Sequence, residues 1–220
     1  MKKQALLLIA CSVFLATDLF SQTSIGISGT YGKSWQHYGD DFQVSGRDLK
    51  IDGYTIALSM YYHLMPHLAV GVEPGLTRRG SACLPGFIWD NPTQFLDATL
   101  YANYLQLPLM IRGEFDLGQS NFFLFGKLGG GPAYMVKGSR KVTFIDQGVE
   151  EETQDIDFAE EENLNRLDVG AYGGAGIGFR LGKGAIQIAS NYYYGFLDVD
   201  DQLTSENRSL QFGLGYQVKL

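Results

Sequence analysis

The stretch from Leu167 to Leu181 constrains the fold of this chain more than any other segment. Its sequence is LDVGAYGGAGIGFRL, and every second residue from Leu167 onward is apolar or glycine. The residues between them are mostly glycine, with Asp168 and Arg180 near the two ends. A period of two over this length predicts a β-strand. Because a strand so long and so rich in glycine is unusual in a water-soluble sheet, the question is what its two faces contact.

Seven further segments alternate between apolar residues and small or polar ones. They cover residues 23–32, 53–63, 67–77, 104–115, 122–136, 185–194 and 209–220. Their connections are short at 64–66, 116–121 and 182–184, and long at 33–52, 78–103, 137–166 and 195–208. An even number of antiparallel strands with short turns at one end and long loops at the other is typical of an outer-membrane barrel. The sequence therefore predicts an all-β fold, an eight-stranded antiparallel up-and-down transmembrane β-barrel over residues 23–220.

A soluble, lipocalin-like barrel also has eight antiparallel strands. Its second face would be a water-exposed surface rich in charged residues. In this chain that face carries Ser, Thr, Gly, Ala and Gln, and the segments 23–32 and 53–63 place no charged residue on it. Small residues suit the crowded interior of an eight-stranded barrel. We therefore expect the apolar face to contact lipid and the glycine-rich face to line the lumen, with tyrosine and phenylalanine near the strand ends forming two interfacial girdles.

Residues 1–22 have the features of a secretory signal peptide. The opening MKK is followed by an apolar run over residues 5–16, which is too short to span a membrane as a helix. We expect cleavage near residue 21 or 22. A lipobox ending in Cys11 is the alternative, although the apolar run continues beyond that cysteine. Removal of the segment leaves Cys83 as the single cysteine, so no internal disulfide holds the fold.

Charge narrows the functional classes. The 220-residue chain has 17 basic and 24 acidic residues, and without residues 1–22 it has 15 and 23, a net charge of −8. This balance disfavours nucleic-acid binding. No apolar run after residue 22 approaches the roughly 18 residues that a helical membrane span needs.

Five segments together resemble a known family. They are YLQLPLMIRGEF (104–115), FFLFGKLGGGPAYMV (122–136), VGAYGGAGIGFRL (169–181), IQIASNYYYGF (186–196) and RSLQFGLGYQVKL (208–220). Over about residues 23–220 the chain resembles the PorT-like outer-membrane β-barrel proteins of Gram-negative bacteria. The resemblance implies an OmpA-like eight-stranded barrel in the bacterial outer membrane, with both termini in the periplasm. Some relatives are linked to protein secretion, whereas most have no known activity. The chain departs from the usual outer-membrane pattern by ending in Leu220 rather than in an aromatic residue.

Residues suited to catalysis are sparse. The only histidines are His37, His63 and His67. The segment HLMPH contains a proline turn, so the helical zinc-ligand spacing does not apply to it. His37 lies near Asp40 and Asp41 in an expected outer loop, and it is the one group that a lipid-modifying enzyme could use. That enzyme is the alternative function. The sequence favours a non-enzymatic barrel without catalytic residues, cofactor or metal, either structural or a platform whose outer loops bind a protein or glycan.

Residues 146–163 form an acidic segment in an expected outer loop. The sequence DQGVEEETQDIDFAEEEN carries nine carboxylates and no basic residue. Like charges favour a solvated loop. The alternative is a divalent-cation site close to lipopolysaccharide, which with the membrane lipid would surround such a barrel. The spacing matches no EF-hand.

The expected lumen face carries a small set of charged residues. They are Glu73, Arg112, Glu114, Lys127, Asp168, Arg180 and Lys219. Buried charges need partners, because desolvation of an unpaired charge is costly. Glu73 and Arg112 lie on neighbouring expected strands and Lys127 on the next, so we expect Glu73 to pair with Arg112 or Lys127. An eight-stranded interior has room only for such packed side chains. The sequence therefore predicts a structural plug that does not conduct ions.

Overall fold

The structure, a computed structural model, describes residues 22–38, 50–83, 95–144, 150–158, 164–200 and 203–220. Its strands are β1 (Thr23–Tyr38), β2 (Ile51–Met65), β3 (Leu68–Val72), β4 (Gly75–Cys83), β5 (Phe95–Gln106), β6 (Leu109–Asp116), β7 (Phe122–Phe144), β8 (Glu150–Asp155), β9 (Leu167–Leu181), β10 (Gly184–Asp200) and β11 (Leu203–Lys219). None of the described residues belongs to a helix long and apolar enough to cross a membrane.

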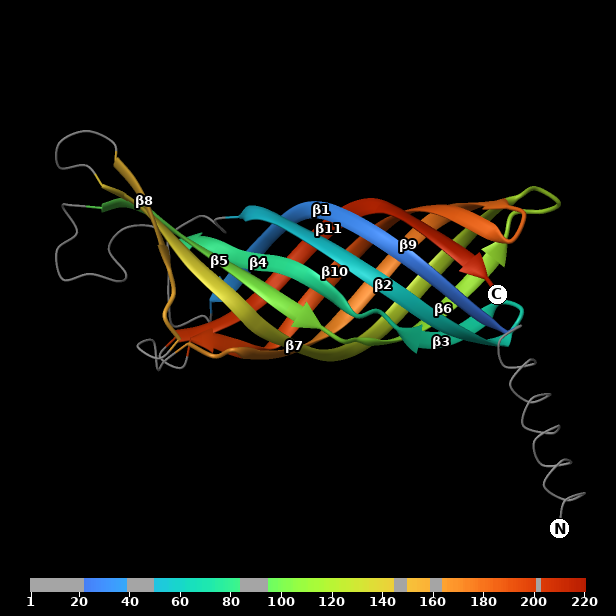
Figure 1. Ribbon diagram of the computed structural model, residues 1–220, viewed down its shortest axis with the longest axis horizontal. Helices are drawn as coiled ribbons and strands as arrows, with labels where there is room; N and C mark the ends of the chain where they lie inside the picture. The colour runs from blue at the N-terminus through green and yellow to red at the C-terminus, as the bar shows by residue number, and fades with distance from the viewer. Residues whose placement is uncertain (1–21, 39–49, 84–94, 145–149, 159–163, 201–202) are drawn as a thin grey trace, which may run out of the picture.

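The strands close into a barrel (Figure 1). β3 and β4 both pair with β2, and β5 and β6 both pair with β7, so each couple forms one interrupted barrel strand. The ring then runs through β1, β2, β3/β4, β5/β6, β7, β9, β10 and β11, with antiparallel pairs throughout. It closes because β11 pairs with β1 from Ser24 to Tyr38. The predicted eight-stranded up-and-down barrel is confirmed.

Prolines account for both interruptions. Pro74 separates β3 from β4, and Pro108 separates β5 from β6. Proline has no amide hydrogen to donate to a strand ladder, so it occurs in strands mainly at edges and irregularities. The wall stays bonded on either side, because the Glu73 amide donates to the Pro108 carbonyl at 3.1 Å and the Leu107 amide donates to the Pro132 carbonyl at 3.0 Å.

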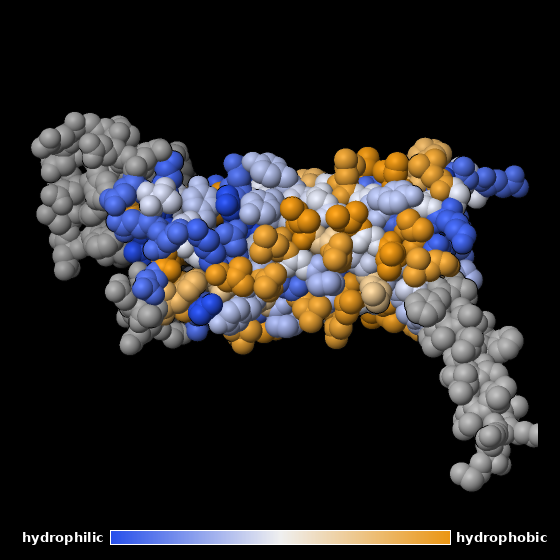
Figure 2. Space-filling view, viewed as in Figure 1, coloured by the Kyte–Doolittle hydropathy of each residue, from blue (hydrophilic) through white to orange (hydrophobic). Residues whose placement is uncertain are grey.

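The two faces of the wall have the predicted orientation. Large apolar side chains point outward, with exposed fractions of 54% for Ile27, 60% for Leu58 and 66% for Leu109. They form an apolar band nearer the end that carries the short turns and where Leu220 lies beside Thr23, here called the turn end; the opposite, loop end is hydrophilic (Figure 2). On the inner face glycine makes room for rings, since a Cβ on Gly176 would lie 2.6 Å from Phe125 and 2.2 Å from the Ile188 carbonyl oxygen.

The strands are longer toward the loop end than the sequence predicts. The expected loop 33–52 is wrong in its first part, because β1 continues to Tyr38, and the expected loop 137–166 is wrong because β7 continues to Phe144. Likewise β4 reaches Cys83, β5 begins at Phe95 and β10 reaches Asp200. The reason is that the strands remain hydrogen-bonded to their neighbours beyond the end of the apolar band. Beyond that band both faces of a strand are polar, so the apolar alternation ends before the ladder does.

The acidic segment is also corrected in part. Residues 150–155 form β8, which pairs with β7 outside the ring, from Ser139 opposite Asp155 to Phe144 opposite Glu150. Beyond β8, Phe158 and Leu164 pack against the buried side chains of Ala102, Tyr104, Ala133 and Met135. The described part of the segment therefore contains a strand instead of being a loop throughout, while the side chains of Glu152, Asp155 and Asp157 are exposed.

Candidate functional site

The lumen contains two groups of charged side chains, one toward each end. The group nearer the turn end, the turn-end cluster, comprises Glu73, Arg112, Glu114, Lys127 and Arg180. Lys127 Nζ lies 2.7 Å from Glu73 Oε2 and 3.0 Å from Oε1, and the Tyr61 hydroxyl donates to Glu73 Oε1 at 2.6 Å. Of the two cations expected beside Glu73, the structure thus brings Lys127 into contact with it.

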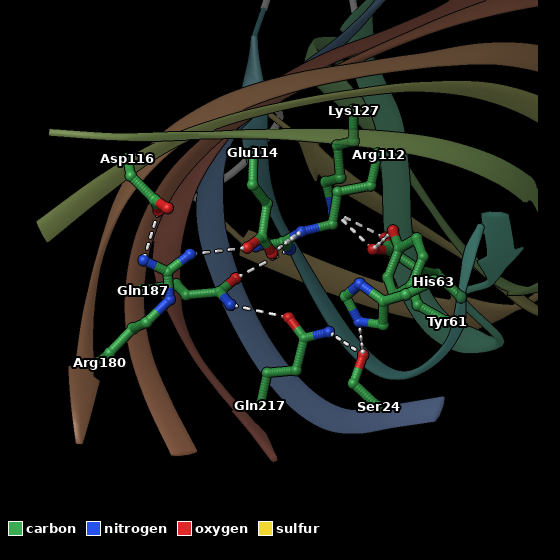
Figure 3. A network of polar contacts seen from close by, with 11 residues as sticks. Ser24, Tyr61, His63, Arg112, Glu114, Asp116, Lys127, Arg180, Gln187 and Gln217 are labelled. Carbon is green, nitrogen blue, oxygen red and sulfur yellow. Dashed lines mark hydrogen bonds and ion pairs between the residues drawn. The ribbon is translucent and has the colours of Figure 1, made fainter. Parts of the chain in front are cut away.

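Arg112 is engaged with other groups. Its Nε donates to Glu114 Oε1 at 3.1 Å and its Nη1 donates to Gln187 Oε1 at 3.0 Å (Figure 3). Arg180 contacts the second oxygen of Glu114 through Nη2 at 3.2 Å, and its Nη1 contacts Asp116. Glu114 therefore links the buried Arg112 to Arg180 at the turn end. Glu114 and Asp116 together neutralise the two arginines.

Amide side chains extend this network across the barrel. Gln187 Nε2 donates to Gln217 Oε1 at 2.8 Å, and Gln217 Nε2 donates to the Ser24 hydroxyl, which lies 3.0 Å from His63 Nε2. The serine–histidine contact has the separation of a nucleophile and its base. Ser24 is fully buried, however, and its oxygen already accepts a hydrogen bond from Gln217. The contact therefore completes the network and presents no nucleophile to a substrate.

The second group, the loop-end cluster, surrounds one arginine, Arg79. Its guanidinium lies 3.4 Å from the ring centroid of Tyr193, and Nη2 donates to Gln106 Oε1 at 2.8 Å and to the Tyr172 hydroxyl at 3.1 Å. Its carboxylate partner is Asp168, at 3.4 Å from Nη1. Arg79 is 1% exposed, so aromatic faces and neutral acceptors supply most of its environment.

Asp168 has a second partner in the same cluster. Asn207 Nδ2 donates to Asp168 Oδ2 at 3.0 Å and lies 3.1 Å from the hydroxyl of Tyr104. Asn207, Tyr104 and Arg79 are each at most 1% exposed. The loop-end cluster therefore fills the lumen from several strands at once.

A neutral polar layer separates the two clusters. Gln211 Oε1 accepts hydrogen bonds from Thr30 at 2.7 Å and from Thr55 at 2.8 Å, and Thr55 lies 2.7 Å from Thr77. A cavity of about 40 Å³ extends from this layer to Arg79 and Lys127, and one of about 30 Å³ is lined by Glu73, Arg112 and Lys127 of the turn-end cluster. Such volumes hold a few water molecules. A wider cavity of about 230 Å³ opens at the turn end, where Glu114 and Arg180 meet Lys219.

Part of this arrangement differs from the sequence prediction. Lys219, expected on the lumen face, is exposed at the rim of the lumen and lines the cavity of the turn end with Glu114 and Arg180. Asp168 is in the lumen, but its cation, Arg79, fell in the expected loop 78–103. A usable signal was present, because the inward positions continue as Gly75, Thr77 and Arg79 once the alternation is followed past the apolar band.

The residues of the enzyme alternative are only partly described. His37 lies in β1, exposed and opposite Glu206 of β11, whereas Asp40 and Asp41 lie outside the described residues, as does Cys11. Within the described ranges no three or more His, Cys, Asp or Glu side chains gather as a metal site. Part of the acidic segment 146–163, for which a divalent-cation site is the alternative, lies outside these ranges.

Comparison with known proteins identifies the barrel domain, not what it binds. A family model described as outer membrane protein β-barrel domain matches residues 20–201. Among solved structures, the chain is similar to the outer membrane protein OprG from Pseudomonas aeruginosa, with 14% identity, 90% of this chain and 97% of that chain covered, and a TM-score of 0.47. It is also similar to neisserial surface protein A, with 14% identity, coverages of 89% and 97%, and a TM-score of 0.44.

A third similar structure is Ail, the attachment invasion locus protein of Yersinia pestis, in complex with the heparin analogue sucrose octasulfate. It has 18% identity, coverages of 89% and 99%, and a TM-score of 0.42. A comparison with curated proteins finds no match. The family match, together with the barrel and its outward apolar band, locates the chain in the bacterial outer membrane.

Proposed function

Since this chain belongs to the outer membrane protein β-barrel domain family, we propose that it is a non-enzymatic barrel with a structural lumen. The observation that carries this proposal is the buried contact of Arg79 with Asp168, Gln106 and Tyr172, which draws side chains from three barrel strands into the centre of the lumen. The six charged residues expected there, Glu73, Arg112, Glu114, Lys127, Asp168 and Arg180, then act as cross-braces of the wall rather than as a transport route.

The second part of the proposal is that the loop end is a platform. β7 is 23 residues long, whereas a tilted strand needs about 9–11 residues to cross a membrane. Since short turns face the periplasm in outer-membrane barrels, the extra length stands on the cell surface. A protein or glycan partner would bind there. The PorT-like resemblance supports a role in protein secretion as the specific form of this platform, and lipopolysaccharide is its lipid surrounding.

The domain limits belong to the same proposal. Residues 1–22 are removed as a signal peptide, and the barrel domain extends over 23–220. Support comes from the start of the barrel wall, because Ser24 already pairs with Lys219 and the Leu220 amide donates to the Thr23 carbonyl. Edman sequencing of the protein extracted from outer membranes should begin near Thr23. A mature chain that begins at Cys11 and carries lipid would contradict this limit.

The proposal is tested by fractionation and gel mobility. The protein should sediment with the outer membrane, and unheated samples should migrate differently from heated ones, because a closed barrel resists detergent until it is heated. Recovery from the soluble periplasm would overturn the proposal. Replacement of His37 by Ala addresses the enzyme alternative directly: unchanged lipid A structure in cells that express H37A supports a non-enzymatic role, whereas a lost lipid A modification would establish the enzyme.

A further inference from the structure

One outward-facing arginine at the loop side of the apolar band is held in place without a carboxylate partner among the described residues. Arg78 of β4 is in register with Tyr54 of β2 and Asn103 of β5. Its guanidinium carbon lies 5.0 Å from the ring centroid of Tyr54 and 5.4 Å from that of Tyr101. Nε makes a long hydrogen bond of 3.5 Å to Asn103 Oδ1. Across the described ranges these contacts leave the terminal nitrogens Nη1 and Nη2 without a partner.

Three other outer-surface cations are paired with carboxylates. The ion pairs are Lys33–Asp52 at 2.6 Å, Lys137–Asp155 at 3.0 Å and Arg208–Glu206 at 3.1 Å. The hydrogen bond from Lys33 also holds the pKa of the Asp52 carboxyl below its usual range, which keeps that carboxylate charged and occupied. Neither Asp52 nor Asp155 contacts Arg78, so the positive charge of Arg78 is available to a ligand.

An apolar row lies directly beneath this arginine. Ile56, Leu76 and Leu105 are neighbours across β2, β4 and β5, two residues closer to the turn end than Tyr54, Arg78 and Asn103. Their exposed fractions are 55%, 36% and 56%. Two residues along a strand correspond to about 7 Å. A molecule with an anionic head and hydrocarbon chains could therefore place its head at Arg78 and its chains on the row below.

We infer that Arg78, steadied by Tyr54, Tyr101 and Asn103, binds the phosphate of an outer-leaflet glycolipid. The two terminal N–H groups of a guanidinium match two phosphate oxygens, and such charge-assisted pairs are stronger than neutral hydrogen bonds. The stacked rings fix the guanidinium before the ligand arrives, which lowers the entropic cost of binding. The Asn103 amide nitrogen is a further donor beside it, since Asn103 Oδ1 faces Arg78 and the Tyr54 hydroxyl.

The inference rests on the proposed surface exposure of the loop end, and its test uses protein already shown to be folded. Full-length mature protein in detergent micelles is first checked for heat-dependent gel mobility. Native mass spectrometry then measures binding of diphosphoryl lipid A, of the same lipid A after phosphatase treatment, and of inorganic phosphate. The variants are Arg78→Gln, Arg78→Lys and, as a matched surface control, Lys33→Gln.

Wild-type protein and K33Q should retain diphosphoryl lipid A equally, and R78Q should weaken binding by about tenfold, as expected for a lost hydrogen bond between charged groups. R78K keeps the charge but loses the paired donors, so its affinity should lie between that of the wild type and that of R78Q. Equal binding of phosphatase-treated lipid A by the wild type would overturn the inference even if R78Q did not fold. So would equal loss in K33Q, or full competition by inorganic phosphate at matched concentration. A failed lipid test with normal heat-dependent mobility leaves the proposed barrel and plug intact.

Discussion

The two charged clusters of the lumen compensate their buried cations in different ways. In the turn-end cluster, Arg112 and Lys127 each contact a carboxylate at about hydrogen-bond distance, 3.1 Å to Glu114 and 2.7 Å to Glu73. In the loop-end cluster, Arg79 has its carboxylate at 3.4 Å and its nearest contacts are neutral. A carboxylate offsets a cation's charge, whereas an aromatic face or an amide offsets only part of its desolvation.

Burial explains why this difference matters. The side chains of Lys127 and Glu73 are 12% and 13% exposed, while those of Arg79 and Asp168 are 1% and 4% exposed. The Lys127–Glu73 pair is therefore more open to water than the Arg79–Asp168 pair, although Arg112 and Glu114 of the turn-end cluster are only 4% and 8% exposed. The loop-end cluster depends on every contact it makes, and we expect it to respond more strongly to substitution.

The largest effect is expected for Arg79→Met. The change removes the cation but leaves Asp168 buried, with Asn207 Nδ2 donating to its Oδ2 in the loop-end cluster. Removing one member of a buried pair costs about 3–5 kcal/mol, because the other charge is left uncompensated. Urea unfolding in lipid vesicles, followed by tryptophan fluorescence, measures the loss. Since Met has a similar length, the loss reflects charge and hydrogen bonding more than volume, and a loss under 1 kcal/mol would contradict the account.

A smaller effect is expected for Lys127→Met. Glu73 keeps the Tyr61 hydroxyl as a donor at 2.6 Å, and its side chain is partly reached by water. The free energy of unfolding should fall by about 2 kcal/mol. The double variant Lys127→Met with Glu73→Gln should recover part of this loss, because the unpaired carboxylate is gone. If K127M were more damaging than R79M, the contrast between the clusters would be reversed.

The smallest effect is expected for Arg180→Gln. Its side chain is 30% exposed and that of Asp116 is 42% exposed, so solvent screens this pair. The buried Glu114, which Arg180 also contacts, keeps Arg112 as its partner. A change of under about 1 kcal/mol is typical of such surface ion pairs, and added salt should reduce it further. Unfolding midpoints measured at low and high salt would show this. A salt-independent loss comparable to that of R79M would mean that the turn end is as sealed as the loop end.

The number of barrel strands and their two faces could be predicted because contact with lipid requires a long apolar alternation, which continues across Pro74 and Pro108 where the strands are interrupted. The sequence left two candidate partners for Glu73, Arg112 and Lys127, because the choice between them depends on the strand register. The observed register places Arg112 opposite Ala69 on the neighbouring strand, four residues from Glu73, and Lys127 reaches the carboxylate instead. Arg79 was missed because the apolar face that reveals a strand ends at Leu76, while the strand continues to Cys83.

Electrical recording in planar lipid bilayers tests the central claim most directly, since that claim is that the two clusters close the lumen. Purified wild-type protein, with its folded state confirmed by heat-dependent mobility, should give no stable, discrete conductance steps. R79M, recorded alongside it, should give more frequent openings than K127M, because the loop-end cluster is the tighter barrier. Stable, uniform steps from the wild-type protein would contradict the plug.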